Sequence, residues 1–316
     1  MQTEQLETLA ALVDEGTFDA AARKLHVTPS AVSQRVKAME QQAGRVLVQR
    51  TTPVTLTEAG DVMLRFARQV ALLEADTLRE LGGGDDQAAG SDSPPGDRPP
   101  ATRMPLAVNA DSLATWFLAS LAGLGDEIGV VFDLHREDQE HTTRLLRQGA
   151  VMAAVTSTRE PVQGCVTSPL GAMRYRAVCS PGFRERWLGG GGEAGAGSDG
   201  GVSAGLLRAR VVHFDRNDDL QEAFLRERLG APGAGPRHCI PTSDDFARAV
   251  ALGFGWGVLP EQQCLGLIAS GALVELAPES PLDVPLYWQR WNLRSTLLDA
   301  VSAAVARGAA ESLRPL

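Results

Sequence analysis

Residues 16–60 read GTFDAAARKLHVTPSAVSQRVKAMEQQAGRVLVQRTTPVTLTEAG, and this stretch decides the fold of the N-terminal part of the chain. Its small and apolar residues predict a first helix over FDAAARKLHV, with a turn at His26–Val27. Thr28 can cap a second helix with its side-chain oxygen, and Pro29 suits the first helical position, where no N–H is needed. The pattern predicts a helix-turn-helix followed by a short β wing.

The second helix has an apolar back and a polar front. Val32, Val36 and Met39 recur at the spacing of a core-facing stripe, and hydroxyl, amide and basic side chains occupy the other side. Such side chains bond base edges and phosphates, so this helix has the composition of a major-groove reader. The residues that we expect to contact DNA, in this helix and in the wing, are Thr28, Pro29, Ser30, Ser33, Gln34, Arg35, Lys37, Arg50, Thr51 and Pro53.

The local charge supports a nucleic-acid partner. Residues 20–56 contain six basic residues and a single acid, a net charge of +5, whereas the whole chain has a formal charge of −9. A basic island in an acidic protein is typical of a surface that faces phosphates. The alternative is a solvated helical hairpin with incidental charge, which leaves the helix cap and the apolar periodicity unexplained.

Two further helices frame this unit. A helix over residues 2–15 completes the DNA-binding domain, which we place at residues 1–60. A long helix over 61–81 carries Met63, Phe66, Val70 and Leu73 at 3-4-3 spacing, which predicts a seam that pairs with a second copy of the chain. The alternative is that this face packs only against its own winged domain.

Two segments of low complexity interrupt the chain. Residues 82–101 are rich in Gly, Pro, Ser and Asp and predict a flexible linker. Residues 189–201 are rich in Gly and contain a formal GxGxxG, but no strand precedes it and no apolar helix follows closely. A dinucleotide site is therefore not expected there, and the segment predicts a surface loop.

From residue 102 to the C-terminus, short apolar strands alternate with amphipathic helices. This pattern predicts two α/β lobes joined by two crossovers, with lobe I formed by residues 102–172 and 284–316 and lobe II by 173–283. Ligands of such sheets bind beyond the carboxyl ends of strands, at helix starts. The polar residues expected at such positions are Asn109, Asp111, Ser112, Thr156, Ser157, Thr242, Ser243 and Asp244. Ordinary helix capping is the alternative for each of them.

Several function classes find no support in the sequence. We find no GxSxG elbow, HExxH motif, phosphate-binding loop or other catalytic arrangement, so an enzyme is not expected, nor is a cofactor. The four cysteines lack CxxC spacing and predict free thiols in a reducing compartment rather than a metal site. No signal peptide and no run of about 18 apolar residues is evident, so we expect neither export nor a membrane partner.

The N-terminal motifs resemble those of the LysR-type transcriptional regulators. The residues that carry the resemblance are Gly16-Thr17-Phe18, Ala20–Leu25, Thr28–Ser33, Glu40 and Thr55–Gly60. Many members have Phe where Val48 stands here; this departure, the Thr51-Thr52-Pro53 tip and the stretch VNADSLATWF at 108–117 resemble the lysine- and arginine-responsive branch that controls basic amino-acid export. The resemblance implies a winged helix-turn-helix, a dimerising linker helix and a two-lobed effector domain like the periplasmic binding proteins.

The same resemblance implies a mode of action. A cytoplasmic dimer or tetramer would bind a pseudo-palindromic operator in double-stranded DNA, contact RNA polymerase, and respond to lysine or arginine bound between the lobes. A cationic effector needs acids, for which we expect Asp111 and Asp133, and an aromatic cover for its stem, for which we expect Trp116 or Phe214. The alternatives are a family member with a different small effector and a general nucleoid-type DNA binder without one.

Overall fold

The computed structural model describes residues 1–82, 101–136, 139–189 and 205–316. Most of the predicted linker at 82–101 and of the insert at 189–201 lies outside these ranges. The chain divides into two compact units. Unit 1 contains residues 1–108, 121–168 and 287–306, and unit 2 contains residues 109–120, 169–286 and 307–316.

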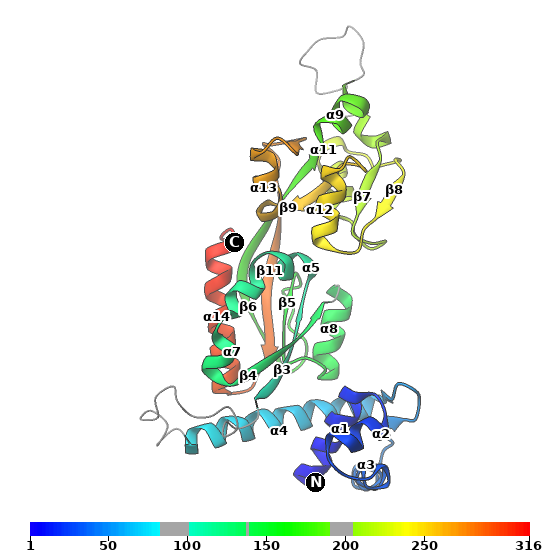
Figure 1. Cartoon of the computed structure of the whole chain (residues 1–316), viewed down its shortest axis with the longest axis vertical. Helices are drawn as coiled ribbons and strands as arrows, with labels where there is room; N and C mark the ends of the chain where they lie inside the picture. The colour runs from blue at the N-terminus through cyan, green and yellow to red at the C-terminus, as the bar shows by residue number, and fades with distance from the viewer. Residues whose placement is uncertain (83–100, 137–138, 190–204) are drawn as a thin grey trace. The chain divides into compact units, whose positions relative to one another are not determined.

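The N-terminal part of unit 1 is the predicted winged helix-turn-helix. Helices α1 (Thr3–Glu15), α2 (Phe18–Lys24) and α3 (Pro29–Ala43) precede a wing of two antiparallel two-residue strands, β1 (Val48–Gln49) and β2 (Thr55–Leu56) (Figure 1). Leu9, Leu12, Val32 and Met39 are fully enclosed in the core that these elements share. Helix α2 ends at Lys24, earlier than expected, because Leu25 caps it and His26 takes a positive φ of 54° in the turn.

Helix α4 (Glu58–Gly82) is the predicted long helix. The apolar residues expected to form one seam fall into two groups. Met63 and Val70 pack against the core of the winged helix-turn-helix formed by residues 1–60, here called the DNA-binding head. Phe66 and Leu73 are 47% and 40% exposed. One stripe of the helix therefore covers its own DNA-binding head and another stays open, and pairing with a second copy stays a prediction.

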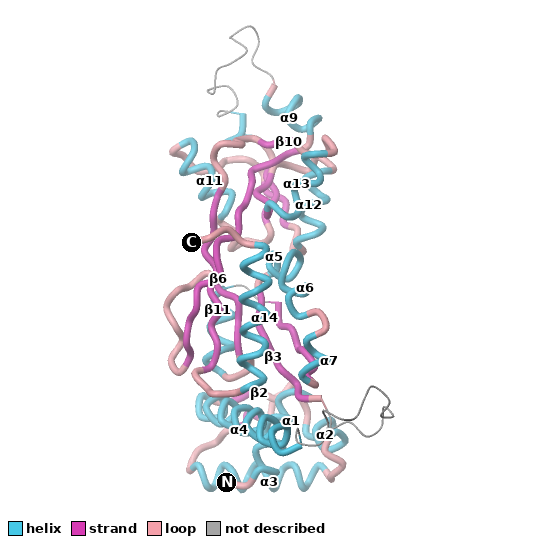
Figure 2. Tube along the Cα trace, turned by 90° about the vertical axis from the view of Figure 1, so that its left-hand side faces the viewer, coloured by secondary structure: helices cyan, strands magenta, loops and turns pink. Residues whose placement is uncertain are grey.

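The rest of unit 1 is an α/β layer. Strand β3 (Thr102–Val108) runs parallel to β4 (Val130–Arg136) and to β5 (Ala153–Thr156), and residues Tyr287–Arg290 of β11 (Leu282–Trp291) pair antiparallel with β5. Helix α7 (Leu124–Ile128) leads into β4. Figure 1 shows α8 (Gln139–Gln148) and α14 (Thr296–Ser312) on opposite sides of these strands, and β5 is buried along its whole length; Figure 2 shows α14 beside β3 and β11 from another side.

Unit 2 is built on β6 (Cys165–Cys179), with which β9 (Gly257–Pro260) and β10 (Val274–Glu275) pair antiparallel. A second, parallel pair joins β7 (Val211–His213) to β8 (Arg237–Cys239). The helices of this unit are α5 (Ala110–Ser112), a π-helical turn (Leu113–Phe117), α6 (Leu118–Leu121), α9 (Pro181–Leu188), α11 (Leu220–Leu229), α12 (Ser243–Ala251) and α13 (Glu261–Ala269).

The structure departs from the expected elements in three places. The sequence pattern predicts a strand over Arg174–Cys179 and a single helix over 111–124. Strand β6 instead begins at Cys165, because its polar first half hides the periodicity. The helix is broken into α5, the π-helical turn and α6. The compact units also differ from the predicted lobe ranges, since residues 109–120 and 307–316 group with residues of lobe II.

None of the described helices is long and apolar enough to cross a membrane.

Candidate DNA-binding surface and effector pocket

Helix α3 presents the predicted polar face. Its first turn is fixed by Thr28, whose Oγ1 accepts a hydrogen bond from Ala31 N at 3.2 Å and lies 2.9 Å from Ser30 Oγ. Val32, Val36 and Met39 are buried behind it. Pro29, Ser30, Gln34 and Lys37 are exposed on the other side, so these side chains are free to meet a groove.

Arg35 lies differently from the expected DNA contact. Its guanidinium donates to Thr8 Oγ1 at 3.3 Å and to Glu4 Oε2 at 3.0 Å on α1, within the head itself. The side chain is half-buried against α1 and its charge is paired, so a contact of Arg35 with DNA stays a prediction that requires this ion pair to open. No periodic pattern in the sequence indicates this pairing, since Glu4 and Arg35 are far apart in the chain.

The wing is fastened to the recognition helix. Arg50 Nη2 donates to Ser33 Oγ at 3.2 Å, and its guanidinium lies 5.4 Å from the centre of the Phe18 ring. Thr51 Oγ1 donates to the Pro53 carbonyl at 2.7 Å, which closes the wing tip. Arg50, Thr51 and Pro53 remain exposed, so the wing tip and α3 can face one DNA duplex together.

Glu40 has a role that the sequence analysis did not assign. Its Oε1 accepts hydrogen bonds from the backbone N–H groups of Leu47 (2.9 Å) and Val48 (3.3 Å). The acid thereby anchors the start of the wing to the end of α3. The available signal was that Glu40 is the one acid within a basic segment, where it would otherwise weaken phosphate binding.

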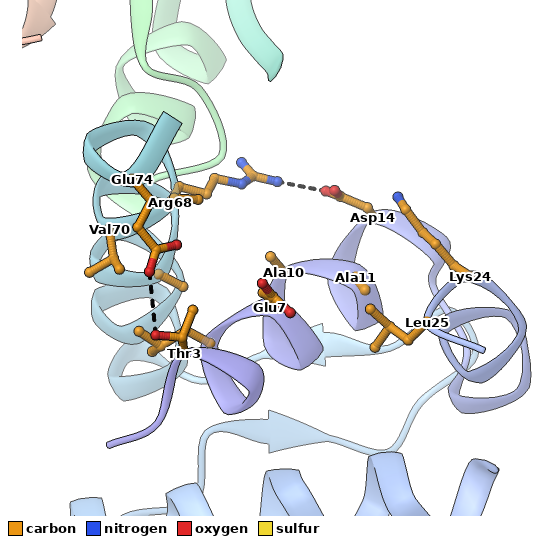
Figure 3. A pocket seen from close by; sticks show the side chains of 13 residues that line it. Thr3, Glu7, Ala10, Ala11, Asp14, Lys24, Leu25, Arg68, Val70 and Glu74 are labelled. Carbon is orange, nitrogen blue, oxygen red and sulfur yellow. Dashed lines mark hydrogen bonds and ion pairs between the residues drawn. The ribbon is translucent and has the colours of Figure 1, made fainter. Parts of the chain in front are cut away.

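A groove of about 230 Å³ lies between α1, α2 and α4 (Figure 3). Its walls are mainly apolar, with Leu6, Ala10 and Val70 among them. Arg68 Nη2 and Asp14 Oδ1 form an ion pair of 2.7 Å, and Thr3 Oγ1 donates to Glu74 Oε1 at 3.4 Å. The groove is an open apolar surface beside the exposed side chains of α4.

A second hollow lies entirely within unit 2. Asp111 contributes to its wall, and its carboxylate accepts hydrogen bonds from Ser243 Oγ at 2.5 Å and Tyr175 Oη at 2.9 Å. Burial raises the pKa of Asp111, the hydrogen bonds from Ser243 and Tyr175 oppose this, and the charge of Asp218 raises it further. Burial beside Asp111 also holds the pKa of Tyr175 well above its ordinary value, so Tyr175 stays a donor.

Asp218 is a second acid in this pocket that the sequence analysis did not select. Its oxygens accept hydrogen bonds from the backbone N–H groups of Phe214 (2.7 Å) and Leu220 (3.2 Å). Burial raises its pKa against these bonds. Phe214, one of the two aromatic covers expected, lines the pocket together with Leu220, Phe246, Val258, Pro260 and Gln263.

The remaining residues expected around Asp111 have capping or bridging roles. Asn109 Oδ1 accepts the Ser112 N–H at 2.9 Å, so this N–H is not free for a ligand, while Ser112 Oγ is buried without a hydrogen-bond partner among the described residues. Thr242 donates to Asp245 Oδ2 at 2.7 Å. Asp244 is exposed and accepts a hydrogen bond of 3.2 Å from Gln263, which also lies 3.2 Å from Ser243 Oγ.

Two residues expected at the cation site lie away from this pocket. Asp133 belongs to unit 1, where it pairs with Arg103 at 2.7 Å and His135 at 3.1 Å. Burial opposes ionisation there, but the hydrogen bond from Arg103 and the charge of His135 hold the pKa of Asp133 below its usual value, so it is already neutralised. Trp116 is buried edge-on against Phe117 and does not line the pocket.

Thr156 and Ser157 lie in unit 1, at the end of β5. Thr156 Oγ1 accepts a hydrogen bond from Thr158 N at 3.0 Å, which closes a local turn. Their part in effector binding stays a prediction.

Two regions of the chain, which together cover most of its length, match the sequence models of known protein families. Residues 3–61 match the family described as bacterial regulatory helix-turn-helix protein, lysR family, and residues 127–310 match the LysR substrate binding domain. The chain belongs to the LysR family. The resemblance inferred from the sequence motifs is thus confirmed, as is the predicted fold of a DNA-binding head followed by an effector-type domain.

Similar proteins indicate which branch of the LysR family this chain resembles. The chain is 44% identical over 309 residues to the HTH-type transcriptional regulator LysG of Mycobacterium tuberculosis, covering 98% of this chain and 93% of that protein. It is 38% identical to the lysine export transcriptional regulatory protein LysG of Corynebacterium glutamicum, covering 98% and 99%.

Two solved structures of this branch are similar over the full length of this LysR-family regulator. The crystal structure of ArgP from Mycobacterium tuberculosis has a TM-score of 0.81 at 43% identity, covering 99% of this chain and 98% of that one. Full-length LysG from Corynebacterium glutamicum with bound effector Arg has a TM-score of 0.74 at 38% identity, covering all of both chains.

Proposed function

We propose that this LysR-family regulator binds operator DNA through α3 and the wing and responds to a basic amino acid held at Asp111. The observation that carries the effector assignment is the composition of the pocket. Asp111 and Asp218 both line it, and none of the described lining residues is basic. Two partly buried acids without a cation favour a ligand that brings positive charge.

The pocket also suits the rest of a basic amino acid. Phe214 and Phe246 offer aromatic surface for an aliphatic stem, and a cation near such a ring gains further attraction. Relatives support the same class, since one LysG structure is described with bound Arg and another LysG as a lysine export regulator. Ser112 of unit 2 is the candidate for the polar groups of the effector, whereas Thr156 and Ser157 of unit 1 stay predictions from the sequence.

Self-association would use the surface around α4. The groove lined by Leu6, Ala10 and Val70 and the exposed Phe66 and Leu73 leave apolar area uncovered in a single chain. A second copy supplies a matching apolar helix, so we propose a dimer through α4, or a tetramer built from such dimers. Two recognition helices in one dimer fit a pseudo-palindromic operator with half-sites about one helical turn apart.

The effector would act by favouring one of two conformations of the oligomer on DNA, since a ligand shifts an equilibrium only through its differential affinity. Contact with RNA polymerase and a cytoplasmic site of action follow from a role in transcription and belong to this proposal. A general DNA binder without an effector is the competing function; it would show weak sequence preference and no response to amino acids.

Titration calorimetry of the full chain tests the effector. We expect binding of arginine or lysine, and binding at least about 10-fold weaker for citrulline, glutamate and phenylalanine. Citrulline is the sharpest comparison because it keeps the shape of arginine without its charge. The Asp111→Asn variant should lose this preference, whereas Asp219→Asn, which removes the same charge from an exposed position, should keep it. Preference for a dicarboxylate or an aromatic acid would contradict the proposal.

A further inference from the structure

A cluster of buried polar side chains lies beside the loop that carries Asp218. His213 on β7, Gln221 on α11 and Trp256 before β9 line a cavity of about 10 Å³ within unit 2. They are 1%, 1% and 0% exposed. His213 Nε2 and Trp256 Nε1 have no hydrogen-bond partner in the part of the chain that the structure describes, and the Gln221 amide has none within 3.5 Å, although it lies near Asp218. Buried polar atoms without partners are rare and call for an explanation.

The hydrogen-bonding character of each group can be assigned. His213 Nδ1 lies 2.9 Å from the carbonyl oxygen of Asp218, which can only accept, so Nδ1 carries the proton. In a neutral ring Nε2 is then a bare acceptor that needs a donor. Trp256 Nε1 is only a donor, and the Gln221 amide is both. A molecule that satisfies all of these groups must both donate and accept hydrogen bonds.

Size and chemistry together select the occupant. A cavity of about 10–15 Å³ holds one water molecule, and such waters typically make about three hydrogen bonds. An ammonium ion could not accept from Trp256, and an anion could not donate to His213. Water can donate to His213 and to the Gln221 oxygen while it accepts from Trp256.

The cluster is joined to the effector pocket through one loop. His213 donates to the carbonyl of Asp218, while Asp218 also lines the effector pocket and its carboxylate accepts from Phe214 N and Leu220 N. The Gln221 amide also lies close enough to Asp218 to lower its pKa against the larger effect of burial. The same residue thus has its backbone tied to the cluster and its charge in the pocket.

We propose that His213, Gln221 and Trp256 hold one ordered water molecule, and that this hydrated cluster is a positioning site for Asp218 in effector recognition. The second half of this statement rests on the proposed function, whereas the water site itself does not. His213, Gln221 and Trp256 are positioning residues, because they would act on the effector only through the loop.

A high-resolution crystal structure of the full chain tests the water site. We expect an ordered water within hydrogen-bond distance of both His213 Nε2 and Trp256 Nε1, and we expect the Trp256→Phe variant to lose or displace it. Side chains that satisfy one another directly, with no water between them, would overturn the proposal. This readout is independent of any effector.

Calorimetry of the same proteins tests the positioning role. Trp256→Phe keeps the ring and removes the donor, and Trp291→Phe is the matched control, since Trp291 is also fully buried with an unpartnered Nε1 but lies in unit 1. We expect arginine to bind Trp256→Phe about 5- to 10-fold more weakly, with citrulline binding little changed, because only the cation senses Asp218. Gln221→Leu should give the same pattern if Trp256→Phe folds poorly.

The outcomes separate the two proposals. An equal loss for arginine and citrulline, or no loss, would overturn the positioning role. Absence of arginine binding by the unaltered chain, with the water present in the crystal, would overturn the proposed effector and with it the positioning role, and would leave the water site standing.

Discussion

Ser243 Oγ donates a hydrogen bond of 2.5 Å to Asp111 Oδ1, joining residues 132 positions apart in the chain. Tyr175 holds the other carboxylate oxygen at 2.9 Å. Two neutral hydroxyl groups orient the acid without cancelling its charge, so the carboxylate is fixed in place, and no counter-ion pairs with it among the described residues. This arrangement is the structural basis for expecting a cationic effector.

The first prediction concerns pH. Because burial raises the pKa of Asp111, a proton competes with the effector cation at mildly acidic pH. Arginine affinity should therefore rise as pH increases through that raised pKa and level off above it, when the carboxylate is ionised. Calorimetry between about pH 4.5 and 8 measures this. The Asp111→Asn variant should bind arginine at least about 10-fold more weakly and lose this rise; a parallel rise in the variant would assign the titration to Asp218 or another group.

Local signals explain why the head could be predicted from the sequence. Thr28, Pro29 and the Val32–Val36–Met39 stripe lie within one short segment, and each acts on its own neighbours. The ion pair of Arg35 could not be predicted there, since its partner Glu4 lies on another helix. Side-chain pairing between helices leaves no periodic trace in a sequence.

The effector pocket depends on distant contacts and was predicted only in part. The strand-end rule selected Asp111 and Ser243, and the structure brings them together. The same rule gave Asp133, which Arg103 neutralises from the neighbouring strand, and it missed Asp218, which follows β7 within a turn. Whether an acid near a strand end is free or paired depends on the register of β3 with β4, which sequence reasoning did not provide.

The second prediction concerns how α3 recognises the DNA sequence. Gln34 is exposed on the polar face of α3, so Gln34→Ala should weaken binding to the native operator by about 1–3 kcal/mol and relax the preference at one base position. Gln41→Ala, an exposed amide near the other end of α3, is the control and should bind normally. Mobility-shift titrations at fixed salt measure both; an unchanged Gln34→Ala titration would mean that another face of α3 enters the groove.

The third prediction concerns the oligomer. Phe66 is 47% exposed on α4 in the single chain, and a partner helix would bury it. Phe66→Glu would then place an unpaired charge in an apolar seam, so the dimer should dissociate and operator affinity should collapse. Sedimentation velocity measures the first effect. Gln42→Glu adds the same charge at an exposed position of α3, away from the seam, and should remain oligomeric; if both variants keep the native sedimentation, the seam lies elsewhere.

The last prediction concerns the stability of unit 1. Asp76 on α4 is 7% exposed, and its Oδ1 accepts hydrogen bonds from Thr296 Oγ1 at 2.8 Å and Leu297 N at 3.1 Å. An acid from the linker helix thus caps the N-terminus of α14, where both the orphan N–H groups and the helix dipole favour a negative charge. Removing such a cap typically costs about 0.5–2 kcal/mol.

Asp76→Ala should therefore lower the midpoint of thermal unfolding by several degrees, since about 1 kcal/mol corresponds to roughly 2–4 °C in a unit of this size. Glu80→Ala removes an exposed acid from the same helix and should leave the midpoint nearly unchanged. Differential scanning calorimetry compares the two. Asp76→Asn should recover part of the loss, because its amide oxygen can still accept from Leu297 while the charge is gone. Equal midpoints for Asp76→Ala and Glu80→Ala would show that α14 is capped without α4.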